Sequence, residues 1–291
     1  MKVLILGSGY IGNHLFNHLK GQHTVHQINQ RRVDYTFTKS FENSQDLRSY
    51  LTDHQYDMAV NCSGYTGRPN VDACEDDKAT CWEYNVTAPP RTAEMLNLFK
   101  IPMIHVSSGC IYQKPRKWTE EDEPNFGLYN RDSSFYSMSK HAGELALDGM
   151  DGYLLRIRMP FCGTNQHKNI LVKYLKYNDI ISQPNSLTSV PDLCRAIEHL
   201  AIHRYTIDNG IYNVVNKGSI TAEQVMGLMK VQGLENPNWN IVKITDLNLK
   251  AGRSNCTLAG EKLWKHIQLP TVVDSLKASI NKLKTVRDGN A

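Results

Sequence analysis

The stretch KVLILGSGYIG, residues 2–12, constrains the fold more than any other part of the chain. It opens with a short apolar run that ends in glycine, which is typical of a buried parallel strand. Residues 10–20 continue with apolar side chains at helical spacing. Gly7 would permit a tight turn, Gly9 would let a pyrophosphate approach the backbone, and Gly12 would let helix and strand pack closely. Because a helix N-terminus also offers free N–H groups to phosphate, the stretch predicts a dinucleotide-binding turn.

Strands and helices continue to alternate up to residue 160. The sequence predicts further strands at 24–29, 56–64, 101–109 and 152–160, and helices at 44–54, 76–100 and 134–147. Parallel strands need crossover helices, so we expect an α/β fold with a Rossmann-type, doubly wound parallel sheet.

The pattern becomes less regular after Pro160. One more helix (185–202) and one more strand (210–216) are predicted to return to the sheet. We therefore expect residues 1–160, with 185–216, to form an NADP-binding domain. Residues 161–184 and 217–291 would form a smaller, C-terminal substrate-binding cap.

Composition excludes several classes of protein. The chain has 291 residues, of which 41% are hydrophobic and 21% charged, as in globular proteins with a sizeable core. A net charge of +4 without a sustained basic run suits a small anionic ligand better than nucleic acid. There is neither a membrane-spanning apolar run nor a signal-peptide pattern, so a cytoplasmic protein is expected. The seven cysteines show no C-x-x-C spacing, so neither a disulfide framework nor a metal site is expected.

The end of the second strand bears on the choice of cofactor. Arg31 and Arg32 stand about 20 residues beyond the glycines, where a carboxylate would bind the 2′-hydroxyl of NAD. Two guanidinium groups there favour the 2′-phosphate of NADP. The alternative is that both arginines are solvated and Asp34 serves NAD.

YSMSK places Tyr136 and Lys140 one helical turn apart on one face. We expect the ammonium group to lower the pKa of the phenol, so that the tyrosine can transfer a proton while a nicotinamide transfers a hydride. Ser108, at the end of a predicted strand, would bind the substrate oxygen with which Tyr136 exchanges this proton.

Cys110 lies two residues after Ser108, at the carboxyl end of a predicted parallel strand, where open α/β sheets bind ligands. A thiol there can act as an acid or a base. The alternative is a buried core cysteine.

Together, the glycine turn and these side chains resemble the extended short-chain dehydrogenase/reductases that act on nucleotide sugars, over essentially the whole chain. The motifs NCSGYTGRPNVDACE, SSGCIY, LRIRMP, NSLT and RSN look like those of nucleotide-rhamnose synthases. The resemblance implies an NADPH-dependent 3,5-epimerase/4-keto-reductase that converts UDP-4-keto-6-deoxy-D-glucose into UDP-L-rhamnose. It also implies that Lys173, rather than Lys168 or Lys176, partners Cys110 from the cap.

The resemblance assigns the remaining site residues. It implies cofactor binding by Gly7, Gly9, Tyr10, Ile11, Gly12, Arg31, Arg32, Cys62, Ser63, Gly64, Tyr65, Asn85, Tyr136 and Lys140. Substrate binding is implied for Gly67, Arg68, Asn70, Ser108, Asn165, Asn185, Ser186 and Arg253, the last as a clamp on the diphosphate. His105 and His141 are interpreted as a strand histidine and a surface histidine.

Three other functions stay open. GDP-fucose synthases run the same reactions with a histidine as acid, and His167 could fill that role. A dTDP-4-dehydrorhamnose reductase would not need Cys110. A non-catalytic NADPH-binding regulatory subunit is the alternative of another class, although such proteins usually lose part of the Ser/Tyr/Lys set. The sequence leaves UDP and dTDP unresolved. The resemblance also implies a homodimer, built on the 76–100 and 134–147 helices, and a separate 4,6-dehydratase that makes the substrate.

Overall fold

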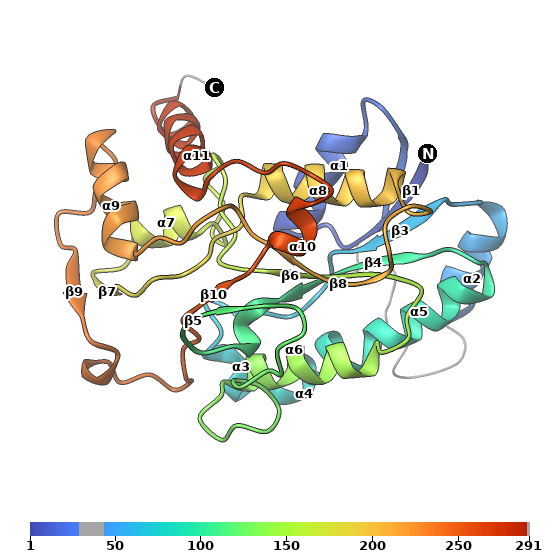
Figure 1. The fold of residues 1–291 in the computed structure, drawn as a ribbon, viewed down its shortest axis with the longest axis horizontal. Coiled ribbons are helices and arrows are strands. Elements are labelled where there is room, and N and C mark those ends of the chain that lie inside the picture. Colours follow the sequence, from blue (N-terminus) through green and yellow to red (C-terminus); the bar gives the residue numbers. More distant parts are fainter. Residues whose placement is uncertain (29–43, 290–291) are drawn as a thin grey trace.

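The central element of the computed structural model is a parallel sheet with strand order β2-β1-β3-β4-β6-β8 (Figure 1). The structure describes residues 1–28 and 44–289. In this part of the chain the sheet strands are β1 (Lys2–Leu6), β2 (Thr24–Ile28), β3 (Met58–Asn61), β4 (Met103–Ser108), β6 (Gly152–Ile157) and β8 (Gly210–Val214). The order reverses at β1 and β3, which makes the gap between them the switch point where such sheets bind ligands. The predicted α/β fold with a Rossmann-like parallel sheet is confirmed.

Helices cover both faces of the sheet, as Figure 1 shows. The helix α1 (Tyr10–Leu19) packs beside α8 (Val190–Ile202), and Val3 and Ile5 belong to the same hydrophobic cluster as these helices. Leu4 and Leu6 instead join the cluster formed with α2 (Ser44–Asp53) and α5 (Ala88–Leu98). Successive strand residues therefore face opposite layers, as the pleat requires, and β1 is apolar and buried from Val3 to Leu6.

The predicted helix at 76–100 is wrong as a single element. The structure divides this region into α3 (Ala73–Asp76), α4 (Lys78–Trp82), a π-helical turn η2 (Glu83–Thr87) and α5. Asp77 leaves helical geometry (φ −126°, ψ 64°) and separates α3 from α4. Pro89 and Pro90 lack the N–H groups that an α-helix would pair with the carbonyls four residues earlier, and the widened turn lies directly before them. Several other predicted elements are shorter than expected, and α8 begins at Val190 rather than at residue 185.

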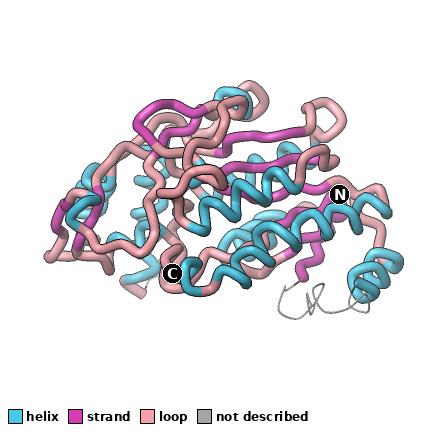
Figure 2. Tube along the Cα trace, turned by 90° about the horizontal axis from the view of Figure 1, so that it is seen from below, coloured by secondary structure: helices cyan, strands magenta, loops and turns pink. Residues whose placement is uncertain are grey.

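A second hydrophobic cluster lies beyond the sheet. It joins α7 (Ile170–Tyr174), α9 (Ala222–Val231) and α11 (Val272–Arg287), next to the parallel pair β7 (Asp179–Ile181) and β9 (Asn240–Val242). Figures 1 and 2 both show β7 and β9 at the end of the molecule away from the N-terminus. This separate cluster is consistent with the substrate-binding cap expected from the sequence, and we propose that it forms that cap.

One part of the expected cap packs elsewhere. The short helix α10 (Glu261–Trp264) contacts β8, and Leu263 and Leu269 belong to the sheet's own hydrophobic cluster. The neighbouring β10 (Cys256–Leu258) pairs in parallel with β5 (Lys114–Trp118). The remaining elements are α6 (Phe135–Ala146) and the 3₁₀ turns η3 (Gly109–Ile111) and η4 (Ile244–Asp246). In the described ranges, no helix is long and apolar enough to span a membrane.

Candidate active site

A cavity of about 880 Å³ opens at the carboxyl ends of β1, β3, β4 and β6, between the sheet and α7. Its lining combines the segments that follow these strands with α6, α7 and residues 247–255. Seventeen predicted residues line this cavity: Gly7, Gly9, Tyr10, Ile11, Cys62, Ser63, Gly64, Gly67, Arg68, Asn70, Asn85, Ser108, Cys110, Tyr136, Lys140, Lys173 and Arg253.

The glycine turn has the geometry that a dinucleotide needs. Gly7 has φ +106°, and an added Cβ would lie 3.1 Å from the backbone nitrogen of Ser63. A Cβ on Gly12 would lie 2.0 Å from the carbonyl oxygen of Gly7, so only glycine allows this contact. Beside Gly9 there is open space, and no side chain caps the N-terminus of α1. Free backbone N–H groups and an open approach fit a pyrophosphate.

Five predicted residues lie outside the cavity lining. Gly12 acts through the turn, and Asn165 is exposed. The hydroxyl of Tyr65 donates to Asp77 at 3.3 Å. Asn185 and Ser186 are buried, and the Asn185 side-chain oxygen accepts hydrogen bonds from Arg158 and from the backbone N–H of Cys256. Arg31 and Arg32, like Asp34, lie outside the described residues.

Ser108, Tyr136 and Lys140 all line the cavity. Tyr136 and Lys140 lie on α6, and both are buried. The Lys140 Nζ atom donates to the carbonyl of Val106 at 3.5 Å, and burial lowers the pKa of Lys140 to about 8 even though the Glu144 carboxylate raises it. Contrary to expectation, the pKa of Tyr136 is raised: burial is the main cause, and nearby thiols, first that of Cys110, add to it, while the Ser108 hydroxyl opposes the change. The phenol is therefore protonated at neutral pH.

Asn85 secures α6 against the π-helical turn. Its side-chain amide donates to the carbonyl of Tyr65 at 2.9 Å and to the Ser139 hydroxyl at 3.0 Å, and its oxygen accepts from the Tyr65 N–H. An added Cβ on Gly143 would lie 2.1 Å from the carbonyl oxygen of Asn85, so α6 approaches this turn closely only because residue 143 is glycine. The helix that carries Tyr136 and Lys140 is thus held in place partly by a close approach at Gly143 that the sequence analysis did not predict.

Cys110 and Lys173 line the same cavity, the first from the turn after β4 and the second from α7. Cys110 is half-buried in η3, and its Sγ accepts a hydrogen bond from Nη1 of Arg158 at 3.0 Å. Lys173 lies on α7, where burial lowers its pKa and the Cys110 side chain opposes that shift. Arg158 was missed by sequence reasoning, although a second arginine at the end of an otherwise apolar strand is a usable signal.

Arg253 is neither free nor a surface loop residue. Its Nη1 and Nη2 atoms donate to the two carboxylate oxygens of Asp72 at 2.7 and 2.8 Å. This contact lowers the pKa of Asp72. The pair links the loop after β3 to residues 247–255 across the cavity, and only part of the guanidinium is occupied by the carboxylate.

Of the two histidines singled out in the sequence, His105 lies where it was predicted and His141 does not. His105 is buried in β4, as predicted, and burial lowers its pKa well below the usual range. His141 was expected at the surface, but it is buried, and its Nδ1 accepts from the N–H of Leu128 at 3.1 Å. The residue has this position because the loop at Gly127 folds directly over its ring.

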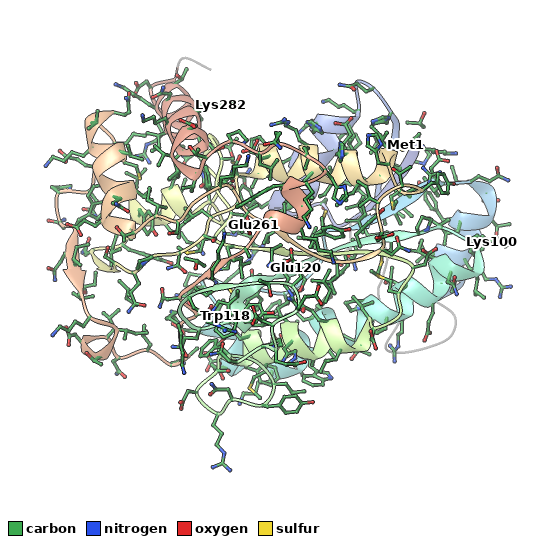
Figure 3. All side chains as sticks on the ribbon, in the orientation of Figure 1. Met1, Lys100, Trp118, Glu120, Glu261 and Lys282 are labelled. Atoms are coloured by element: carbon green, nitrogen blue, oxygen red, sulfur yellow. The ribbon has the colours of Figure 1, made fainter. Side chains whose placement is uncertain are left out.

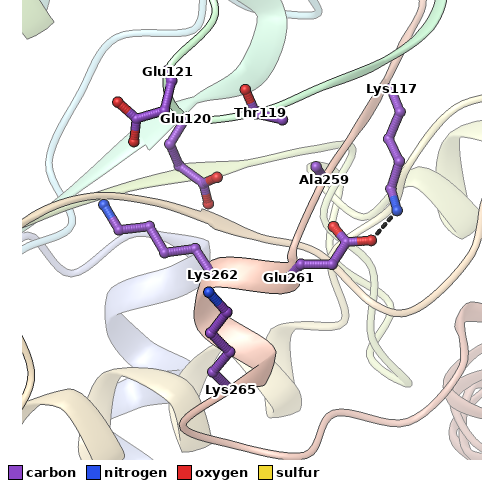
Figure 4. A pocket seen from close by; sticks show the side chains of 8 residues that line it. All are labelled: Lys117, Thr119, Glu120, Glu121, Ala259, Glu261, Lys262 and Lys265. Carbon is purple, nitrogen blue, oxygen red and sulfur yellow. Dashed lines mark hydrogen bonds and ion pairs between the residues drawn. The ribbon is translucent and has the colours of Figure 1, made fainter.

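A second cavity, of about 620 Å³, lies beside α10 (Figure 4). Figure 3 shows Glu120 and Glu261 near each other in this region. The lining residues are Lys117, Thr119, Glu120, Glu121, Ala259, Glu261, Lys262 and Lys265. Four of the charges have internal partners: Lys117 pairs with Glu261, Glu120 accepts from the N–H of Asn213, and Lys262 donates to the carbonyl of Ile211. No cysteine, serine or histidine is among these lining residues, and we assign no reaction to this cavity.

The parallel sheet, the glycine turn and the buried Ser-Tyr-Lys set define an enzyme of the short-chain dehydrogenase/reductase class. The chain belongs to the RmlD substrate-binding domain family, whose model matches residues 1–285.

The curated relatives include enzymes of the plant Arabidopsis thaliana. The chain is 28% identical over 296 residues to a trifunctional UDP-glucose 4,6-dehydratase/UDP-4-keto-6-deoxy-D-glucose 3,5-epimerase/UDP-4-keto-L-rhamnose-reductase of Arabidopsis thaliana, covering 97% of this chain and 41% of that enzyme. It is 29% identical over 209 residues to a bifunctional dTDP-4-dehydrorhamnose 3,5-epimerase/dTDP-4-dehydrorhamnose reductase of the same plant, covering 67% of this chain and 66% of that one. The chain thus spans well under half the length of the trifunctional relative.

Among solved structures, the L780 UDP-rhamnose synthase of Acanthamoeba polyphaga mimivirus superposes with a TM-score of 0.83 at 24% identity. The match covers 97% of this chain and 99% of that one. This likeness establishes the shared fold.

Proposed function

We propose that the protein is an NADPH-dependent UDP-4-keto-6-deoxy-D-glucose 3,5-epimerase/4-keto-reductase that makes UDP-L-rhamnose. The observation that carries the proposal is that Cys110 and Lys173 line the same cavity as Ser108 and Tyr136. A simple reductase needs only the second pair. The names of the plant relatives, which combine epimerase and reductase activities, support the same reading.

The residues present fit NADPH. The turn at Gly7, Gly9 and Gly12 would hold the pyrophosphate, and Lys140 would hold the nicotinamide ribose. When bound, the reduced nicotinamide supplies the hydride for carbon 4 of the sugar.

The epimerisation follows from the chemistry of the ketone. A 4-keto group acidifies the hydrogens on carbons 3 and 5, and inversion needs a base on one face of the ring and an acid on the other. Cys110 at the sheet edge and Lys173 on the cap would provide these groups. Ser108 and Tyr136 would stabilise the negative charge that develops on the carbon 4 oxygen. Tyr136, which burial keeps protonated, then donates its proton to that oxygen during reduction.

Cations at the cavity support an anionic, diphosphate-bearing substrate. Arg68, Lys168 and Lys173 all line it, and in the described ranges none of them forms an ion pair with a carboxylate. Arg253 adds a guanidinium group that is partly neutralised by Asp72. The substrate would come from a 4,6-dehydratase, the activity that appears in the name of the trifunctional relative.

Hydrogen exchange tests the epimerase. The protein is incubated with UDP-4-keto-6-deoxy-glucose in heavy water without NADPH, and deuterium at carbons 3 and 5 is measured by NMR. We expect uptake at both carbons, and loss of uptake in Cys110→Ser and Lys173→Met. Lys176→Met serves as the matched control, because Lys176 follows α7 on the exposed surface and does not line the cavity. Unchanged uptake in Cys110→Ser would refute the proposal, and NADPH oxidation without any uptake would leave a simple reductase.

His167 supports one alternative, because it also lines the cavity. In a GDP-fucose synthase-like enzyme this histidine would replace Lys173 as the acid. His167→Ala would then abolish deuterium uptake while Lys173→Met would not, and GDP-linked substrate would be preferred over the UDP-linked one. If the native protein shows neither deuterium uptake nor NADPH oxidation, the result would instead indicate a non-catalytic NADPH-binding subunit.

We also propose a homodimer that packs through the helices on the α5–α6 side. Trp82, Leu98 and Leu145 lie on these helices and are 39%, 70% and 50% exposed. Large apolar side chains gathered on one side of a protein often mark an interface. Sedimentation at micromolar concentration, with Leu98→Glu/Leu145→Glu as the disrupted variant, tests this assembly.

A further inference from the structure

Arg158 is a buried cation without a carboxylate partner. It follows β6, and its side chain is 2% exposed. Nη1 donates to Cys110 Sγ at 3.0 Å and to the Ser254 hydroxyl at 3.3 Å, while Nη2 donates to the Ser254 carbonyl at 3.0 Å and to the side-chain oxygen of Asn185. Nε has no partner among the described residues. Every acceptor around this guanidinium is formally neutral, except for a sulfur that can become a thiolate.

Arg156, two residues earlier, shows what the fold does for a buried arginine that is only structural. Its Nε and Nη2 donate to one carboxylate oxygen of Glu144 at 3.0 and 2.8 Å. Both side chains of that pair are nearly inaccessible to solvent. A buried charge is costly unless an opposite charge accompanies it. β6 and the segment directly after it therefore carry one neutralised arginine and one whose positive charge is left for another group.

We propose that Arg158 is the positioning residue that supplies the countercharge to the thiolate form of Cys110. The inference rests on the proposed epimerase function and deepens it, because it assigns the base. The thiolate removes the proton from carbon 3 or carbon 5, forming an S–H bond, and the C–H electron pair becomes the enolate with its charge on the carbon 4 oxygen. The Lys173 ammonium returns a proton to the opposite face of that carbon. The thiol then gives its proton to solvent and the amine takes one from solvent, which restores both groups.

The other titratable groups near Cys110 agree with this assignment. Tyr136 and Lys140 approach it from α6, Lys173 from α7, and Cys256 from β10. None of these groups is a carboxylate, so no fixed negative charge in this set competes with a thiolate for Arg158. Cationic surroundings of this kind favour the thiolate in proteins generally.

Thiol alkylation against pH tests the proposal without any substrate. Iodoacetamide is applied between pH 6.5 and pH 9.5, and modification of the Cys110 peptide is followed by mass spectrometry in the native protein, Arg158→Gln and Arg158→Lys. We expect the native thiol to react about tenfold faster than that of Arg158→Gln at pH 6.5, and at nearly the same rate at pH 9.5, where ordinary thiols also ionise. Arg158→Lys, which keeps a positive charge, should resemble the native protein at low pH.

A native-to-variant rate ratio that is the same at both pH values would overturn the proposal, because it reports a change in access rather than in charge. Arg158→Lys behaving like Arg158→Gln would overturn it as well. If Arg158→Gln does not fold, the thiolate absorbance near 240 nm of native protein minus Cys110→Ser gives a second measurement. Its absence at pH 7.5 would also count against the proposal. These readouts need no nucleotide sugar. The role of Arg158 can therefore be refuted while deuterium exchange supports the epimerase, and the epimerase can be refuted while the role of Arg158 is supported.

Discussion

We expect the buried ammonium group of Lys140 to destabilise the folded protein. Its side chain is 5% exposed, and burial lowers its pKa from the ordinary 10.5 to about 8. Each tenfold loss of proton affinity corresponds to about 1.4 kcal/mol. Replacing this buried ammonium by an apolar side chain of similar length, Lys140→Met, should therefore raise the free energy of unfolding by about 3 kcal/mol at pH 7.

The sign and the pH range follow from the same pKa shift. Below pH 8 the lysine is protonated in both states, so the folded protein bears the full cost of the buried charge. Between pH 8 and about 10.5 the folded state has released the proton and the unfolded state has not, so native stability rises with pH. The advantage of Lys140→Met should shrink over that range and disappear near pH 10.5.

Urea unfolding at pH values from 6.5 to 10 measures this difference. Groups other than Lys140 titrate in both proteins, so their contributions cancel when the two free energies are subtracted. Lys140→Leu is a second variant with the same expected sign. A stability difference that does not change with pH would refute the reasoning, because it would show that the folded lysine titrates normally or is already neutral at pH 7.

Two further predictions concern neighbouring parts of the site. Gly12→Ala places a Cβ 2.0 Å from the Gly7 carbonyl oxygen, so we expect about 1–3 kcal/mol of destabilisation and weaker NADPH binding by fluorescence titration. In Gly9→Ala the new Cβ meets nothing within 4 Å, so this variant should lose NADPH binding but keep its thermal stability. Equal losses of stability in the two variants would contradict this account. Glu144→Gln leaves the Arg156 charge buried and unpaired, which costs about 3–5 kcal/mol. For a chain of 291 residues this corresponds to a fall in Tm of about 5–8 °C by calorimetry, and a fall below about 1 °C would show that the pair contributes little.

Local patterns in the sequence predicted most of the sheet. The apolar run of β1, the glycine turn and the start of α1 are contiguous, so their spacing alone indicates the strand–turn–helix unit. Tyr136 and Lys140 share a helix face for the same reason. Where the sequence prediction was wrong, the cause was also local but subtle: the two prolines at 89 and 90 and the non-helical backbone at Asp77 divide the expected helix at 76–100.

The sequence by itself determined the α/β class, the nucleotide turn and the residue types of the cavity, because these depend on periodicities within single segments. Only the tertiary structure decided the electrostatics. Arg158 meets Cys110, Asn185 and Ser254, which lie 48, 27 and 96 positions away along the chain, and Arg253 meets Asp72 across 181 positions. The pKa of Tyr136 rises rather than falls because burial and the nearby thiols at this junction raise it, and only the Ser108 hydroxyl opposes them. Burial and charge pairing depend on which distant segments meet, and no spacing within one segment contains that information.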